Sequence, residues 1–569
     1  MIQKIKQVIK RQKVLLIIAA ISTSSFFAIS FVDNQFEISK NLDIFATLFR
    51  EVNIYYVEET NPGELLKKGI DAMLESLDPY TNYIPESDIE DYRFMTTGEY
   101  GGIGALIRQK GDYVVIAEPY EGYPAQIAEL MAGDIILEVN GKSAKGKTTS
   151  DISKILKGQP NTEVKLLIKR ENEQENIEKT VIRQEIKLND VSYYGMINDK
   201  TGYIKLSGFT ATASKEFKEA FITLKEKHNM KNLIFDLRGN GGGLLRESVN
   251  IVNIFVDKGQ EIVSTKGRVK NWDRVHKALN APVDLEVPVT VLTDRNSASA
   301  SEIVSGALQD LDRAVIIGQR TFGKGLVQQT RPLSYNAQMK VTVAKYYIPS
   351  GRGIQKLDYS HRNKDGSVES IADSLIKPFK TKNGRVVYDA KGIAPDIETE
   401  EKKYASITAS LAAESWIFDY ATIYRAKHPA IPAPSEFKLS DAEYDAFVKF
   451  MEGKTYDYST ATEKVVEELK TTAEKEKYFA AFTQEYEILR NKIKKNKQAD
   501  LYTFKDEIKE FLENEIVSRY YYQKGRIEAS IKYDTEIQKA IEVLENKTFY
   551  VSILDGTNLT GSKVDSKGN

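Results

Sequence analysis

Residues 287–311 read VPVTVLTDRNSASASEIVSGALQDL. The apolar run Val287–Leu292 has the length of a buried strand, and the apolar residues of 303–311 recur at helical spacing. Residues 293–298, mostly small and polar, separate the two and predict a tight turn. This stretch therefore predicts a strand that passes through a turn into a helix, which is the repeating unit of α/β folds.

The same alternation continues around this stretch. Predicted strands lie at 202–208, 232–237 and 314–318, and an amphipathic helix lies at 213–227. Because short apolar strands alternate with helices, residues 186–400 predict an α/β core with crossover helices.

The flanking regions have a different pattern. Residues 33–97 predict a helical region broken at Asn61-Pro62-Gly63, and residues 98–185 predict short strands with a hairpin turn at Asn140-Gly141. Residues 401–569 predict a charged helical extension. The predicted fold class is thus multidomain α/β: a β-rich domain precedes or is inserted into an α/β core, between two helical regions.

Composition narrows the function. The 569 residues are 41% hydrophobic and 28% charged, and the net charge is −1. A chain without a basic field is not expected to bind nucleic acid. The chain has no Cys, and none of its four His lies in the motifs described below. We therefore expect no disulfide, no metal site and no cofactor.

The N-terminus predicts export. Basic residues precede an uncharged run of 19 residues, Val14–Val32, and acidic residues follow it. A run of this length can span a bilayer, and the basic flank orients the N-terminus to the cytoplasm. A cleaved signal peptide is the alternative, with Ala28-Ile-Ser30 as the cleavage site. Residues 1–32 are thus an anchor or a signal peptide, and both place the remainder outside the cytoplasm.

Ser299 is the serine that we select among Ser297, Ser299 and Ser301. It begins the predicted helix and, with Glu302, matches the capping pattern Ser-x-x-Glu. One interpretation is a plain N-cap, which contributes about 1 kcal/mol. The other is a nucleophile, because a helix start directs N–H groups and the helix dipole toward an anion. The N–H of Ala300 can then stabilise the oxyanion.

Lys324 lies between Gly323 and Gly325. A lysine titrates near ~10.4 in solution, so burial must lower its pKa by roughly 3 units before it serves as a base at neutral pH. Three apolar neighbours can supply the low-dielectric wall: Phe322, Leu326 and Val327. The alternative is a solvated lysine in a glycine turn.

Gln328 is the residue that we expect to orient Lys324. In an extended strand, positions 324, 326 and 328 share one face, so Gln329 points away. A serine and a lysine form a complete hydrolytic pair that needs neither His nor a metal ion.

The glycine-rich run Arg238-Gly-Asn-Gly-Gly-Gly243 follows a predicted buried strand. A phosphate loop is one alternative, but the run lacks the Gly-Lys-Ser/Thr ending. A loop that lies along a substrate backbone and donates a second oxyanion N–H fits the pattern better.

Residues 98–185 resemble a PDZ domain. The similarity rests on Gly101-Gly-Ile-Gly104 and on Gly133-Asp-Ile-Ile-Leu-Glu-Val-Asn-Gly141. A PDZ domain binds a C-terminal carboxylate on backbone N–H groups and adds the peptide as a strand. The loop Gly102, Ile103 and Gly104 is thus the predicted substrate-binding element, with Ile103 and Leu106 as pocket residues.

Residues 40–400 resemble the C-terminal processing peptidases, or tail-specific proteases, of serine peptidase family S41. The motifs are Asp236-Leu-Arg238, the glycine run, Ser297-Ala-Ser-Ala-Ser-Glu302 and Phe322-Gly-Lys-Gly325. The resemblance implies Ser299 as nucleophile, Lys324 as base and Gln328 as its orienting partner. It also implies an oxyanion hole made by the N–H groups of Gly243 and Ala300.

The resemblance implies an endopeptidase that cleaves proteins near their C-termini, with a PDZ domain that captures the tail or gates the site. With the N-terminal segment, it predicts a protease on the periplasmic side of the inner membrane, or in the periplasm if that segment is cleaved. The expected partners are protein substrates with free C-terminal tails, the membrane, and a second copy in a homo-oligomer. A PDZ scaffold with a non-catalytic, protease-like core is the alternative function.

Overall fold

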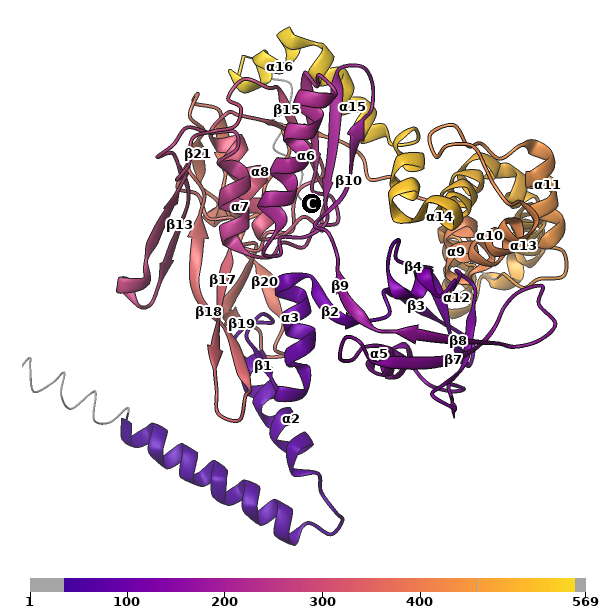
Figure 1. Ribbon diagram of the computed structural model, residues 1–569, viewed down its shortest axis with the longest axis horizontal. Coiled ribbons are helices and arrows are strands. Elements are labelled where there is room, and N and C mark those ends of the chain that lie inside the picture. The colour runs from indigo at the N-terminus through magenta and orange to yellow at the C-terminus, as the bar shows by residue number, and fades with distance from the viewer. Residues whose placement is uncertain (1–34, 457, 558–569) are drawn as a thin grey trace, which may run out of the picture. The chain divides into compact units, whose positions relative to one another are not determined.

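The computed structural model describes residues 35–456 and 458–557 (Figure 1). The described chain divides into two compact units with a boundary between Tyr83 and Ile84. The run Val14–Val32, predicted as an anchor or signal peptide, lies outside the described residues. Within the described residues, no helix combines the length and the apolar character needed to cross a bilayer.

The first unit is helical. Residues 35–55 form a helix, and α2 (Pro62–Glu75) follows it. The Asn61 side chain accepts hydrogen bonds from Gly63 N and Glu64 N, and Pro62 occupies the first helical position, where no N–H is needed. The break predicted at Asn61-Pro62-Gly63 is therefore confirmed. Strand β1 (Asn82–Ile84) spans the boundary between the two units.

The second unit begins with the β-rich domain. After α3 (Ile89–Thr97), a six-stranded antiparallel sheet has the order β3-β4-β5-β7-β8, with β6 paired to β5, and the short ribbon β2–β9 joins the two ends of the domain. These strands are β2 (Glu99–Gly102), β3 (Ala105–Lys110), β4 (Tyr113–Pro119), β5 (Ile135–Val139), β6 (Lys142–Ser143), β7 (Glu163–Lys169), β8 (Ile177–Ile182) and β9 (Gln184–Lys187). The helices are α4 (Pro124–Ile127) and α5 (Thr149–Leu156). The short strands and the hairpin turn at Asn140-Gly141 that the sequence predicts here are confirmed.

A six-stranded sheet forms the α/β core, in the order β10-β11-β12-β15-β16-β23. All neighbours pair in parallel except β10 with β11. The strands are β10 (Val191–Met196), β11 (Thr201–Leu206), β12 (Asn232–Asp236), β15 (Val289–Thr293), β16 (Val315–Gly318) and β23 (Ile397–Glu398). Crossover helices are α6 (Ala213–Lys227), α7 (Leu245–Val252) and α8 (Ala300–Asp310). The predicted α/β core is confirmed.

The two faces of this sheet are covered by helices from distant parts of the chain. Along β12, Leu233 and Phe235 pack with α6, α7 and α8, whereas Ile234 packs on the opposite face with α15 (Thr535–Glu545) and α16 (Lys547–Leu554). A mainly parallel sheet needs cover on both faces, because its strands are apolar on both sides. The segment 535–554, which the sequence analysis assigned to the extension after residue 400, thus supplies the second layer of the core.

An antiparallel sheet adjoins the core and was not predicted. It contains β17 (Leu326–Pro332), β18 (Gln338–Tyr347), β13 (Glu261–Gly267) and β14 (Arg274–Lys277), paired in that order. Two short hairpins follow in the chain: β19 (Leu357–Arg362) with β20 (Val368–Ser370), and β21 (Pro378–Lys380) with β22 (Val386–Tyr388).

The region after residue 400 is helical, as predicted. A separate apolar cluster unites α9 (Ser406–Ala413), α10 (Trp416–Lys427), α11 (Asp441–Phe450) and α14 (Lys505–Ile531). Helices α12 (Ala461–Lys475) and α13 (Thr483–Thr503) complete the set.

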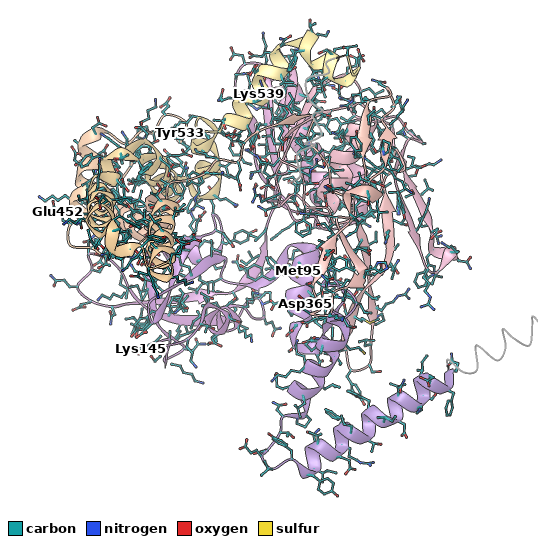
Figure 2. All side chains as sticks on the ribbon, turned by 180° about the vertical axis from the view of Figure 1, so that it is seen from behind. Met95, Lys145, Asp365, Glu452, Tyr533 and Lys539 are labelled. Atoms are coloured by element: carbon teal, nitrogen blue, oxygen red, sulfur yellow. The ribbon has the colours of Figure 1, made fainter. Side chains whose placement is uncertain are left out.

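On α15, the exposed Glu542 pairs with Lys539 at 2.9 Å (Lys539 is labelled in Figure 2).

Candidate active site

Ser299 lies where β15 has ended and α8 begins. It is the N-cap of α8 and has φ 55° and ψ −110°. A non-glycine residue with positive φ is strained, and such strain gathers at functional sites. Two contacts hold this backbone: Ala298 N donates to Asn240 O at 3.0 Å, and Tyr346 Oη donates to Ser299 O at 3.1 Å. The turn is therefore fixed from both sides.

The two neighbouring serines have different surroundings. Ser297 and Ser301 are fully buried, and their hydroxyls donate to Leu237 O and Asn240 O, each at 2.9 Å. Ser299 is half-buried. Ser297 and Ser301 therefore tie the turn to the glycine-rich loop, and Ser299 is the serine of the three that retains exposure to a substrate.

A buried carboxylate joins the Ser299 turn to the Lys324 loop. Glu302 Oε2 accepts from Ser299 N at 2.8 Å and from Lys324 N at 2.9 Å, while Oε1 accepts from Thr321 Oγ1 at 2.6 Å and from Gly323 N at 2.7 Å. Ser299 N and Lys324 N donate to the same carboxylate oxygen. The backbones of the two predicted catalytic residues therefore lie close together. Burial raises the pKa of Glu302, and these four donors oppose that shift by stabilising the ionised form.

The sequence assigned Glu302 only a helix-capping role. The same carboxylate also accepts hydrogen bonds from the loop about 20 residues later, and local pattern cannot reveal such a contact. The one signal available was that the capping Glu302 is followed closely by a second glycine-flanked motif.

Lys324 lies in the loop that precedes β17 and is half-buried. Its flanking glycines are required by packing: a Cβ on Gly323 would lie 2.6 Å from Lys356 Cβ, and one on Gly325 would lie 2.9 Å from Gln355 N. Of the apolar neighbours, Leu326 is buried, Val327 is half-buried and Phe322 is exposed. The lowered pKa of Lys324 stays a prediction.

The strand argument for Gln328 needs correction. Strand β17 begins at Leu326, after Lys324, and its pairing with β18 shifts register between Val327 and Gln328. The unpaired residue at this shift is Val343 of β18, so β17 keeps its own alternation, but Lys324 lies before the strand and that alternation does not extend to it. Gln328 Nε2 donates to Thr342 Oγ1 at 3.1 Å, and Gln329 is exposed. The role of Gln328 beside Lys324 stays a prediction.

The glycine-rich loop packs directly on the Ser299 turn. A Cβ on Gly242 would lie 2.7 Å from Ala298 O and 3.0 Å from Ala300 N, so only glycine allows this approach. The amides beside Gly243 are engaged, because Gly242 N donates to Asn240 Oδ1 at 2.9 Å and Leu244 N donates to Phe209 O at 2.8 Å.

Gly243 itself is exposed and has φ 155°, and a Cβ there would lie 2.4 Å from Phe209 O. The structure thus brings the loop that carries Gly243 next to Ala300, the two residues predicted to form the oxyanion hole. Buried Asn240 organises this contact, and sequence reasoning missed it: its Nδ2 donates to Leu206 O at 2.8 Å, and its backbone oxygen accepts from the Ser299 turn.

The predicted carboxylate loop of the β-rich domain is tightly packed. Gly102 ends β2, Ile103 is 3% exposed in the domain core, and Gly104 has φ 73°. A Cβ on Gly104 would lie 2.6 Å from Tyr123 Cβ, which explains the glycine without a bound anion. The Ile103 side chain is therefore buried in the domain core, whereas Leu106 is exposed. Binding of a carboxylate by the backbone of residues 102–104 stays a prediction.

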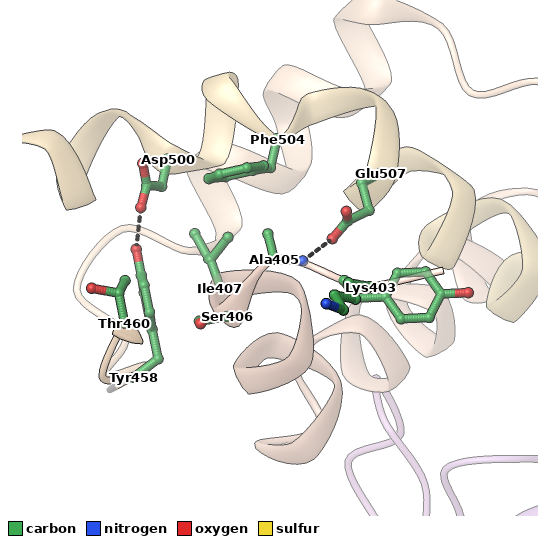
Figure 3. A pocket seen from close by; sticks show the side chains of 10 residues that line it. Lys403, Ala405, Ser406, Ile407, Tyr458, Thr460, Asp500, Phe504 and Glu507 are labelled. Atoms are coloured by element: carbon green, nitrogen blue, oxygen red, sulfur yellow. Dashed lines mark hydrogen bonds between the residues drawn. The ribbon is translucent and has the colours of Figure 1, made fainter. Parts of the chain in front are cut away.

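A separate hollow of about 390 Å³ lies in the helical region (Figure 3), and none of the predicted site residues lines it. Its walls are Lys403, Tyr404, Ala405, Ser406, Ile407, Tyr458, Thr460, Asp500, Phe504 and Glu507.

Among residues 35–456 and 458–557, no group of three or more His, Asp or Glu side chains could hold a metal ion.

Comparison with known proteins gives matches along most of the chain. The family model "Peptidase family S41" matches residues 200–360, "PDZ domain" matches 115–170, and "Probable PDZ-protease, C-terminal helical domain" matches 407–544.

Individual relatives are similar over the same region. A "Carboxy-terminal-processing protease" from Bartonella bacilliformis is 35% identical over 326 residues, which cover 57% of this chain and 74% of that protein. A "Probable CtpA-like serine protease" from Staphylococcus aureus is 31% identical over 369 residues, which cover 64% and 66%. Among solved structures, the "Photosystem II D1 C-terminal processing protease" is 27% identical, with a TM-score of 0.34, and the match covers 63% of this chain and 92% of that one.

Proposed function

The chain belongs to peptidase family S41 and carries a PDZ domain, and on that premise we propose that it is a serine endopeptidase that cleaves proteins near their C-termini. The observation that carries this proposal is the shared hydrogen bonding of Ser299 N and Lys324 N to Glu302 Oε2. That contact holds close together the backbones of the proposed nucleophile and the proposed base, which lie in separate sequence motifs.

The proposed reaction begins when Lys324 Nζ takes the proton of Ser299 Oγ, which attacks the scissile carbonyl carbon. The carbonyl oxygen becomes an oxyanion that receives hydrogen bonds from Gly243 N and Ala300 N. When the intermediate collapses, the C–N bond breaks, the leaving amine takes the proton from Lys324, and an acyl-enzyme remains on Ser299. Water then releases the acyl group with the same base. Gln328 is proposed to orient Lys324.

The PDZ domain is proposed to bind the free C-terminal tail of the substrate or to gate access to Ser299. The backbone of Gly102, Ile103 and Gly104 is the proposed carboxylate-binding element, since β3 starts directly after it and can accept a peptide as an added strand. Paired peptides that end in a free acid or an amide test this proposal, because only the first carries the charge that the loop would bind.

We place the enzyme in the cell envelope, outside the cytoplasm, on the strength of the basic residues and the apolar run Val14–Val32. Membrane fractionation with N-terminal sequencing separates an anchor from a cleaved signal peptide. A soluble cytoplasmic protein with Met1 intact would overturn both.

The deciding experiment for catalysis compares wild type with Ser299→Ala on a protein substrate that has a flexible C-terminal tail, followed by mass spectrometry. We expect turnover to fall by several orders of magnitude, to roughly the 10³-fold or 10⁴-fold residual rate that enzymes keep without their nucleophile. Lys324→Arg should be equally inactive, because a guanidinium cannot take up a proton. Normal cleavage by Ser299→Ala would refute Ser299 as the nucleophile, whereas no cleavage by wild type itself would favour the alternative, a PDZ scaffold with an inert core.

A further inference from the structure

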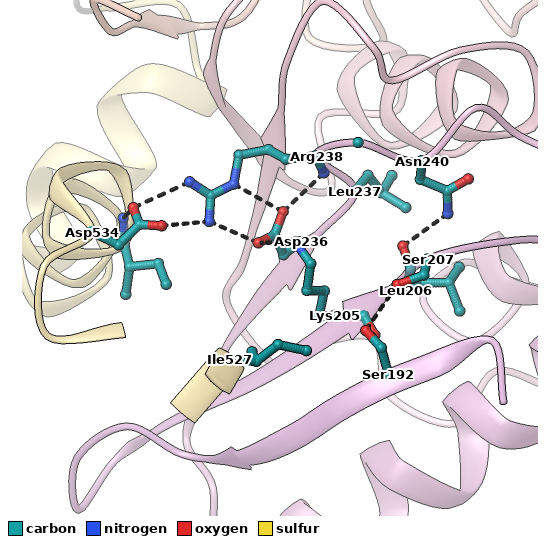
Figure 4. Close-up of polar contacts among 12 residues, drawn as sticks. Ser192, Lys205, Leu206, Ser207, Asp236, Leu237, Arg238, Asn240, Ile527 and Asp534 are labelled. Atoms are coloured by element: carbon teal, nitrogen blue, oxygen red, sulfur yellow. Dashed lines mark hydrogen bonds and ion pairs between the residues drawn. The ribbon is translucent and has the colours of Figure 1, made fainter. Parts of the chain in front are cut away.

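Arg238, the first residue of the glycine-rich loop, is held by carboxylates from two domains (Figure 4). On one side, its Nε donates to Asp236 Oδ1 at 3.0 Å and its Nη2 to Asp236 Oδ2 at 2.7 Å. On the other side, Nη2 lies 2.8 Å from Asp534 Oδ2, and Nη1 donates to Asp534 Oδ1 at 3.1 Å and to Glu536 Oε2 at 2.6 Å. Both later residues belong to the start of α15, in the C-terminal helical domain.

The pair is largely shielded from water. Asp236 is fully buried, and the Arg238 and Asp534 side chains are 17% and 23% exposed. Tyr203 Oη and Lys205 Nζ also donate to Asp236 Oδ2. Burial alone would lower the pKa of Arg238, but Asp236 and Asp534 raise it well above its usual value. A bidentate pair in such a setting fixes the plane of the guanidinium as well as its charge.

The orientation of Arg238 is transmitted to the loop through backbone contacts. Arg238 N donates to Asp236 Oδ1 at 2.9 Å, and the next residue, Gly239, donates its N–H to Asp294 Oδ1 at 3.0 Å. Asn240 N then donates to Leu237 O at 3.2 Å, and Asn240 O accepts from Ala298 N. The backbone from Arg238 to Asn240 is therefore held at each residue, and the Gly242–Gly243 segment begins two residues after Asn240.

We propose that Asp534 is a positioning residue for catalysis: through Arg238, it holds the glycine-rich loop in the geometry in which Gly243 N faces the oxyanion. This inference rests on the proposed function and deepens it, because it makes the C-terminal helical domain a working part of the active site.

Asp534 is better suited than Glu536 to test the idea. Glu536 Oε1 also accepts from Thr399 Oγ1 at 2.6 Å and from Gln319 Nε2, so its removal disturbs several contacts. Asp534 has two roles, the pair with Arg238 and the N-cap of α15, where its Oδ1 accepts from Glu536 N and Ile537 N at 3.0 Å. Asn caps helices as well as Asp does, so Asp534→Asn keeps the cap and removes the charge and one acceptor.

The experiment measures kcat and KM of Asp534→Asn on a tailed substrate, together with the affinity of a peptide boronate that forms a tetrahedral adduct with Ser299. We expect kcat to fall about tenfold with KM unchanged, less than the roughly hundredfold loss for removing an oxyanion donor outright. Boronate affinity should fall by the same factor, while binding of uncleaved substrate, measured in a Ser299→Ala background, stays constant.

Two variants control for a merely structural effect. Val543→Ala weakens the packing of α15 on the sheet without touching Arg238, so it should lower Tm and leave kcat and boronate affinity at wild-type values at a temperature well below its Tm. Glu542→Gln removes an exposed charge from the same helix and should change neither.

The outcomes separate the two proposals. If Ser299→Ala is inactive and Asp534→Asn keeps wild-type kcat and boronate affinity, the role of Asp534 is refuted and the proposed protease stands. If Val543→Ala loses as much kcat as Asp534→Asn, the effect is structural and the role of Asp534 is also refuted. If Ser299→Ala remains active, the proposed function itself has failed.

Discussion

Two surfaces of the C-terminal helical domain differ in character. Helices α15 and α16 pack on the core sheet through an apolar face that includes Ile537, Val543 and Leu544. Helix α10 contacts the PDZ domain through one buried aromatic residue, Phe418, which lies among charged groups. The Phe418 ring lies between two guanidinium groups, with its centroid 3.6 Å from Arg108 Cζ and 4.3 Å from Arg519 Cζ. Both surfaces belong to the same C-terminal helical domain.

The PDZ surface also has polar contacts, because Gln126 Nε2 donates to Tyr522 Oη at 2.8 Å and two ion pairs join the same surfaces. Lys110 Nζ pairs with Asp419 at 2.7 Å, and Arg526 Nη2 pairs with Glu118 at 2.6 Å. Separating this surface exchanges ion pairs for water, whereas separating α15 from the sheet exposes the core. The difference teaches that α15 and α16 belong to the core of the catalytic sheet, and we expect the PDZ surface to open more readily than theirs.

The strongest way to break this contrast is Val543→Asp. Val543 is fully buried against the sheet, and an unpaired carboxylate there should destabilise the fold by about 4 kcal/mol or more. We expect the variant to lack a cooperative thermal transition by circular dichroism. The neighbouring Glu542→Gln should melt as wild type does. A Val543→Asp variant with a near-normal Tm would mean that α15 is dispensable for the core.

Phe418→Ala should loosen the PDZ domain alone. It removes the ring between Arg108 and Arg519 and a small apolar cluster, a loss of about 3 kcal/mol if the site collapses poorly. Hydrogen exchange of β3 and β4 should accelerate, while β12 and α15 keep wild-type protection. Val465→Ala, at an exposed position of α12, is the control. Equal acceleration in β12 would show that the two surfaces are coupled.

The two surfaces should respond to pH with opposite signs. Burial alone would raise the pKa of Asp236, but Arg238 and Lys205 hold it well below its usual range, so its stabilising effect is lost as the pH falls below about 4. Burial raises the pKa of Glu118 despite Arg526, so the native state binds this proton more tightly than the unfolded chain does. The stability that this proton contributes is lost as the pH rises above about 4.

The measurement is Tm against pH for Asp236→Asn and Glu118→Gln, each relative to wild type. The deficit of Asp236→Asn should shrink as the pH falls, and Glu118→Gln should gain on wild type as the pH rises. Parallel curves for the two variants would contradict the assignment.

Lys110→Gln should have the smallest effect. The Lys110–Asp419 pair is partly exposed, and pairs of this kind contribute about 1 kcal/mol or less, which salt screens. The difference from wild type in β3 exchange should vanish in high salt. A salt-independent difference would indicate that Lys110 contributes through packing.

The sequence was informative where local pattern determines structure. The strand–turn–helix at 287–311 was predictable because an apolar run, a small-residue turn and a capping box lie in succession. Burial of Ser297 and Ser301 was not, because both hydroxyls bind backbone of the strand and loop about 60 residues earlier. The strand-face argument for Lys324 does not hold because β17 begins only at Leu326, and the sequence does not show at which residue pairing with β18 starts.

The position of α15 shows a second limit. Its apolar face, with Ile537, Ala540 and Val543 at helical spacing, was readable, but periodicity does not say which surface a helix covers. One clue was available: the apolar run at 232–237 implies a strand covered on both faces, and the predicted crossover helices needed a partner layer.

The second layer of the core also has a consequence for the order of biosynthesis. Strands β11, β12, β15 and β16, with Ser299 and Lys324, are all translated before α15 and α16. Until residue 534 has been made, Arg238 lacks Asp534, and until residue 554 has been made, the cover of Ile234 and Leu292 is incomplete. A nascent chain therefore contains both catalytic candidates long before it contains the layer that completes their sheet, so the order of translation itself delays assembly of the active site.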